Sequence, residues 1–213
     1  MRSGYWYEAK QFAEADGQIS KDIILWHEFR SGRGNPTDLK EFLRRNKDWP
    51  GLPYLKEKGE QVFFESGRND VLSWFDKYPP KSGTAAIIYA DALLEVGNKN
   101  KAELILQDKW ISEIMDPDLR TLYLKKYDTA LSEFHDERVI ELLWRDAFSA
   151  VDELMPLLSE DYKKLVKAVL ALRKYQKEGV NILINRVPET LRDHPILNFA
   201  RFKWRLQFGY DDR

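Results

Sequence analysis

The side chains with the most obvious capacity for chemistry are three histidines, His27, His135 and His194, which lie far apart in the sequence. His27 precedes Glu28, but the residues that follow are Phe29–Ser31. This pair is therefore not the His-Glu-x-x-His motif, in which two histidines on one helical face bind zinc. The histidines alone predict no metal centre.

The segment His135-Asp136-Glu137 is the one local cluster of potential metal ligands. Its residues are adjacent, whereas helical ligands of one ion need a spacing of three or four residues. We interpret it as a solvent-exposed turn. The segment Gly32-Arg33-Gly34-Asn35 lacks the further glycines, or the Lys-Ser/Thr pair, of a phosphate-binding loop. We therefore predict no metal and no cofactor, and we assign no catalytic residue.

The composition excludes some classes of protein. The chain has 34 Lys and Arg against 35 Asp and Glu, a formal net charge of −1, which argues against a nucleic-acid-binding protein. No apolar run approaches the roughly 18 residues of a membrane span. The absence of cysteine excludes disulfides and thiolate chemistry, but it selects no compartment. The N-terminal residues lack the apolar core of a secretory signal, which indicates either a cytoplasmic protein or one whose signal has been removed.

Apolar spacing and helix-start signals predict an all-α chain. Asn35 is expected to cap a helix with Pro36 at its first position, and Pro50 must end that helix before the chain reverses at Gly51. Ile182–Ile184 is the best candidate for a strand, but it lies between helical signals. The expected helices cover residues 4–15, 22–29, 35–46, from the corner to about 66, 69–78, 84–96, 101–115, from 117, 138–144, 149–158, from 159, 179–187 and 195–208.

Glycine-marked turns recur at intervals of 28 to 35 residues, except for the 82 residues between Gly97 and Gly179, which leave room for two further units. A period near 30–40 residues is typical of an α-solenoid. The segment Leu93–Glu103 resembles a tetratricopeptide (TPR) turn. We therefore predict one domain over residues 1–213, a right-handed superhelical α-solenoid of TPR-like helical hairpins. Gly209–Arg213 reads as the turn before another helix, so we expect the chain to be an N-terminal piece of a longer protein.

The corner Asp48-Trp49-Pro50-Gly51-Leu52 and its flanks resemble the N-terminal superhelical domain of soluble lytic murein transglycosylases. The resemblance covers nearly the whole chain, although each motif is short. The motifs that carry it, besides the corner, are Gly4-Tyr5-Trp6, Asp22–Trp26, Trp74-Phe75, Pro79-Pro80, Ala92–Gly97 and Arg138–Trp144.

The resemblance implies a non-catalytic domain that scaffolds a catalytic domain and positions peptidoglycan glycan strands in the periplasm. In that family a glutamate of a Glu-Ser-Ser motif, in a separate C-terminal domain, acts as general acid and base. Glu65-Ser66 is the nearest match here, but Gly67 follows it. The family's Gly-Leu-Met-Gln and Tyr-Asn elements are absent, so we interpret Glu65 as an exposed surface residue. The alternative function is a TPR-like protein–protein interaction module.

Seven tryptophans could stack on sugar rings, but each lies among apolar neighbours, as in Leu142-Leu143-Trp144. We expect them to anchor the core, because large rings dominate burial energetics. The lysines of 163–167 are expected to form a solvated face. No binding residue is assigned from the sequence. The tryptophans are Trp6, Trp26, Trp49, Trp74, Trp110, Trp144 and Trp204.

Overall fold

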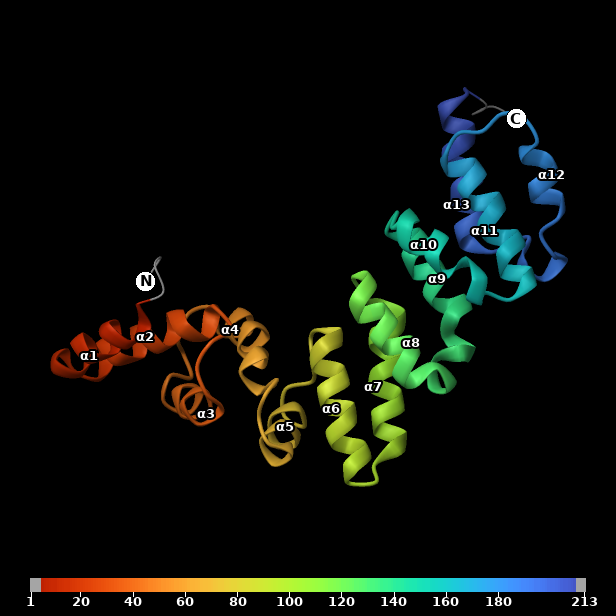
Figure 1. Cartoon of the computed structure of the whole chain (residues 1–213). Helices are drawn as coiled ribbons and strands as arrows, with labels where there is room; N and C mark the ends of the chain where they lie inside the picture. The colour runs from red at the N-terminus through yellow and green to blue at the C-terminus, as the bar shows by residue number, and fades with distance from the viewer. Residues whose placement is uncertain (1–4, 210–213) are drawn as a thin grey trace. The chain divides into compact units, whose positions relative to one another are not determined.

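The computed structural model describes residues 5–209, and this part of the chain is all-helical, without a strand (Figure 1). The predicted elements at Gly4 and at residues 210–213 lie outside the described residues. The chain divides into two compact units, one extending to Leu106 and the other beginning at Gln107. Among the described residues, no helix combines the length and the apolar character that crossing a membrane requires.

In the first unit, α1 packs on α2, α2 on α3 and α4, and α5 on α6. Large aromatic side chains, among them Phe29, Phe42, Phe63 and Tyr89, form its core. Its helices are α1 (Trp6–Asp16), α2 (Gln18–Arg30), α3 (Pro36–Arg45), α4 (Leu52–Gly59), the 3-10 helix η1 (Glu60–Phe63), α5 (Arg68–Phe75), α6 (Gly83–Glu95) and the first part of α7 (Lys99–Ser112).

In the second unit, α9 packs on α10, and α11 packs on both α12 and α13. The helix α8 is interrupted at Tyr127, whose backbone angles of φ −132° and ψ 19° are not helical. After the end of α7, the elements are α8 (Pro117–Leu131), η2 (Ser132–Phe134), α9 (His135–Trp144), α10 (Phe148–Leu154), η3 (Met155–Leu157), α11 (Glu160–Arg173), α12 (Val180–Asn185), η4 (Glu189–Leu191) and α13 (Pro195–Gln207).

Three predicted helix starts are confirmed by side-chain caps. The backbone N–H of Asp38 donates to the side chain of Asn35 over 2.9 Å, and that of Leu119 donates to Asp116 over 2.8 Å. Ser159 accepts in the same way at the start of α11. Each cap supplies an acceptor for an N–H that the helix itself cannot pair.

The helix predicted over residues 179–187, which includes Ile182–Ile184, is confirmed by α12. Two expected bounds differ clearly from the observed elements. The second helix begins at Gln18 rather than at residue 22. The helix after the corner ends at Gly59 rather than near residue 66, and a 3-10 turn follows. Glycine is a poor helix former, and the adjacent Glu60 turns its carboxylate to the start of α6. A tertiary contact therefore replaces the continued helix.

The corner is held by side chains from α2, from α3 and from the corner itself. Gly51 has φ 72°, a left-handed conformation that favours glycine. The indole N–H of Trp26 donates to the Pro50 carbonyl over 3.1 Å, and the Trp49 ring lies 5.6 Å from the Phe42 ring. The buried carboxylate of Asp22 accepts from Arg45, which ties the end of α3 to α2.

The expectation that the tryptophans anchor the core is confirmed for Trp74 and Trp110, which are fully buried. It is wrong for Trp144, which is 41% exposed. The buried face of α9 runs through Val139 and Leu142. Trp144 is at the last position of the helix, and its ring lies 5.2 Å from that of Phe199. The other four, Trp6, Trp26, Trp49 and Trp204, are half-buried.

Candidate functional site

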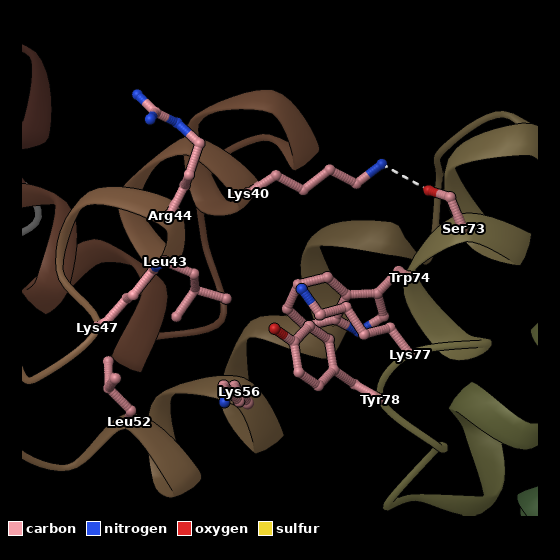
Figure 2. A pocket seen from close by; sticks show the side chains of 10 residues that line it. All are labelled: Lys40, Leu43, Arg44, Lys47, Leu52, Lys56, Ser73, Trp74, Lys77 and Tyr78. Carbon is pink, nitrogen blue, oxygen red and sulfur yellow. Dashed lines mark hydrogen bonds between the residues drawn. The ribbon is translucent and has the colours of Figure 1, made fainter.

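A basic cleft in the first unit is the strongest candidate site (Figure 2). It has a volume of about 720 Å³ and is lined by residues of α3, the corner, α4, α5 and the turn after α5. Four lysines and one arginine contribute to it, and no carboxylate does. Its lining residues are Lys40, Leu43, Arg44, Lys47, Leu52, Lys56, Ser73, Trp74, Lys77 and Tyr78.

Helical periodicity explains how α3 presents its side of the cleft. Leu39 and Phe42 are fully buried and fix the orientation of the helix. Residues 40, 43 and 44 have the spacing i, i+3, i+4, which places them on one side of α3. Lys47 follows the end of the helix, in the turn of the corner. The corner then returns the chain, so that Lys56 of α4 enters the same cleft.

Two of the basic side chains already have carboxylate partners. Lys40 Nζ lies 2.8 Å from Asp70 and donates to Ser73 Oγ over 2.8 Å, the bond drawn in Figure 2. Arg44 donates to both carboxylate oxygens of Glu41 over 2.7 and 2.8 Å. The hydrogen bonds from Arg44 and Arg45 lower the pKa of Glu41 to about 2, so this carboxylate stays ionised at neutral pH.

The other three lysines of the cleft, Lys47, Lys56 and Lys77, have no carboxylate partner among residues 5–209. Lys56 Nζ lies 4.7 Å from the centroid of the Tyr78 ring, and Lys77 Nζ lies 5.2 Å from it. Both are within the range of a cation–π interaction, which leaves their positive charge unneutralised. A cleft lined by charge of one sign concentrates counter-ions of the opposite sign.

The aromatic wall of the cleft is rigid. Trp74 is 2% exposed, stacks on Phe63 at 4.5 Å between centroids and contacts the Tyr78 ring at 4.6 Å. Figure 2 shows Trp74, Lys77 and Tyr78 together on one side, with the α3 side chains on the other. Packed side chains of this kind hold a binding surface in a fixed geometry. Positive charge, N–H donors and aromatic surface together suit the binding of an anionic ligand.

The interpretation of His135 as part of an exposed turn is wrong. His135 is 5% exposed at the first position of α9, with its ring 5.6 Å from that of Trp110. It begins the apolar stripe that continues through Val139 and Leu142, and burial lowers its pKa. The neighbouring Asp136 accepts from the Ser159 N–H over 3.0 Å. No group of three potential metal ligands occurs in the described part of the chain.

The other residues singled out in the sequence lie apart from the cleft. Glu65 is exposed in the turn before α5, as interpreted. His27 is exposed and meets Trp26 edge-on at 4.8 Å. His194 caps α13 by accepting the Ile196 N–H over 3.3 Å. The predicted solvated lysine face is confirmed for Lys164 and Lys167, which are exposed, whereas Lys163 is half-buried.

The basic cleft was missed in the sequence, although one signal for it was present. The spacing of Lys40 and Arg44 on one side of the expected helix was visible, but their position opposite Lys77 and Tyr78 depends on the fold. Comparisons of the chain with protein-family models, with curated proteins and with solved structures found no match. The function of the cleft is therefore inferred from its own chemistry.

Proposed function

We propose that the chain is a non-catalytic binding module whose basic cleft holds a peptidoglycan glycan strand. The observation that carries this proposal is the set of uncompensated ammonium groups of Lys47, Lys56 and Lys77 beside Trp74 and Tyr78. Peptidoglycan is a polymer of sugar rings whose peptide substituents bear carboxylates; a lactyl group without a peptide also ends in a carboxylate. The lysines attract those carboxylates, and the tyrosine offers an aromatic surface to a sugar ring.

The wider setting of the proposal comes from the resemblance to soluble lytic murein transglycosylases. It comprises a right-handed, TPR-like superhelical arrangement, a periplasmic location and a separate catalytic domain that this region scaffolds. Its support is the helical content of residues 5–209 and the corner geometry at Gly51. In this setting the isolated chain should not clear purified cell walls, and lytic activity of residues 1–213 would contradict the non-catalytic role.

Changing Lys47, Lys56 and Lys77 together to glutamine is expected to weaken binding to purified peptidoglycan sacculi by about tenfold or more. A tenfold change in affinity corresponds to about 1.4 kcal/mol of binding free energy, which is small for the loss of three charged contacts. Co-sedimentation with sacculi at increasing NaCl measures the effect. The affinity of the unchanged chain should fall as salt screens the lysines.

The matched control changes Lys164, Lys167 and Lys174 of the second unit to glutamine. These three lysines are exposed and lie outside the cleft. This triple variant loses the same number of charges and should bind sacculi like the unchanged chain. If both triple variants lose binding equally, the binding depends on net charge rather than on the cleft. If the unchanged chain does not sediment with sacculi, the proposal is refuted.

The alternative function, a TPR-like protein-interaction module, has one specific observation in its favour. Gly97 has φ 78°, and the Asn98 N–H donates to the Leu93 carbonyl over 2.9 Å, closing a tight turn at the end of α6. This is the segment whose sequence resembles a TPR turn. This function would be favoured if the chain does not bind sacculi but binds a glutamate-rich peptide through the same three lysines.

A further inference from the structure

A second, smaller pocket lies in the second unit, where α12 and α13 pack against α11. It has a volume of about 320 Å³, at the lower end of the range for small-molecule sites. Its polar lining comes from two asparagines of α12 and two arginines of α13, and Trp204 lies among them. No carboxylate lines it.

The four polar side chains occur in pairs with helical spacing. Asn181 and Asn185 are four residues apart on α12, and Arg201 and Arg205 are four residues apart on α13. Side chains at i and i+4 are neighbours on a helix surface, and like charges in that relation repel each other. Within residues 5–209, none of the four has a hydrogen-bond or ion-pair partner. An anion between the two guanidinium groups would relieve their repulsion.

The apolar part of the pocket is fixed in place. The indole N–H of Trp204 donates to the Gln176 carbonyl over 2.8 Å, and its ring lies 4.9 Å from that of Phe208. Leu172 and Val180, which also line the pocket, are buried. The pocket therefore combines a held apolar wall with a polar rim of asparagine and arginine side chains, and small-molecule sites commonly pair these two kinds of surface.

We propose that this pocket binds a small organic carboxylate that carries a neighbouring amide. The guanidinium groups of Arg201 and Arg205 donate to the carboxylate, because their planar N–H forks match its two oxygens. Each asparagine offers an N–H₂ donor and a carbonyl acceptor, which is the complement of an amide. The apolar wall accommodates a methyl or acyl group. N-acylated peptides with a free C-terminus and N-acylated sugar acids both present this chemistry.

The test uses two acids and their neutral counterparts. N-acetyl-alanyl-alanine is compared with its C-terminal amide, and N-acetylmuramic acid is compared with N-acetylglucosamine, by calorimetric titration of the whole chain. At least one acid is expected to bind, with its neutral counterpart at least tenfold weaker. Whichever acid binds identifies the source of the ligand. Binding of neither acid, or equal binding of an acid and its neutral form, overturns the proposal.

Variants then locate the binding. Changing Arg201 and Arg205 to glutamine should abolish it, and changing both to lysine should weaken it, because lysine keeps the charge without the planar fork. Arg186→Gln, which removes a charge outside the pocket lining, should leave it unchanged. Chemical-shift changes of the Trp204 indole N–H report directly on the pocket. The pocket and the basic cleft use different residues, so sedimentation with sacculi and binding of these acids can fail independently.

Discussion

Replacing Arg138 with alanine is expected to lower the free energy of unfolding of the second unit by about 3–5 kcal/mol. Arg138 is 1% exposed, and its guanidinium carbon lies 4.2 Å from the centroid of the Trp110 ring. It donates to the carbonyls of Trp110 and Glu113, the latter over 3.0 Å. Burial lowers its pKa to about 10, so it remains protonated at neutral pH. Truncation leaves these carbonyls without their donor and opens a cavity beside Trp110.

Urea unfolding, followed by circular dichroism, measures this loss. Arg138→Met separates packing from charge, because it fills much of the same volume without donating a hydrogen bond, and it should cost less than alanine. Arg186→Ala is the surface control, since Arg186 is exposed, and it should change stability by no more than about 0.5 kcal/mol. A loss below about 1 kcal/mol for Arg138→Ala would show that the buried guanidinium is dispensable.

Glu60→Ala is expected to lower the free energy of unfolding of the first unit by about 2–4 kcal/mol, because several hydrogen-bond donors then lose the buried carboxylate that accepts from them. Glu60 is 4% exposed. Its carboxylate accepts from the N–H groups of Lys81 and Ser82 over 2.9 and 3.1 Å, and from the Ser82 hydroxyl over 2.5 Å. The same hydroxyl caps α6 by accepting the Ala85 N–H. Without the carboxylate, η1 loses its link to the start of α6.

The stabilising effect of Glu60 should also depend on pH. Burial raises its pKa above the ordinary value of 4.5. When the folded value exceeds the unfolded one, the contribution is fully present below the unfolded pKa and is lost as pH rises through the folded pKa. The stability of the unchanged chain relative to Glu60→Gln should therefore fall as the pH rises above the ordinary carboxyl value of 4.5. A stability difference that grows as the pH rises would contradict the raised pKa.

The helices of this chain were predictable because their signals are local. Asn35, Asp116 and Ser159 each cap a helix within three residues of their own position, so no knowledge of the fold was needed. The helix after the corner was extended too far because its end depends on Glu60, whose partners lie more than twenty residues along the chain.

The candidate sites were not predictable because they depend on contacts between residues that are far apart in the sequence. Lys56 and Tyr78 are far apart in the sequence, and only packing brings an ammonium group over that ring. His135 looked like a turn because two acids follow it, yet its own side of the helix faces Trp110. Charged residues next to a side chain in the sequence do not show whether that side chain is exposed. Its position around the helix decides its burial.

The grouping of positive charge in one cleft affects how the protein binds to charged surfaces such as ion-exchange resins. The formal net charge is −1, so the surface outside the cleft must carry the excess negative charge. An ion-exchange resin makes contact with local patches, whose fields extend about 10 Å at moderate ionic strength. Although the isoelectric point is about 6.4, the protein should be retained by a cation exchanger at pH 7. Changing Lys47, Lys56 and Lys77 to glutamine should make it elute earlier than changing Lys164, Lys167 and Lys174 does.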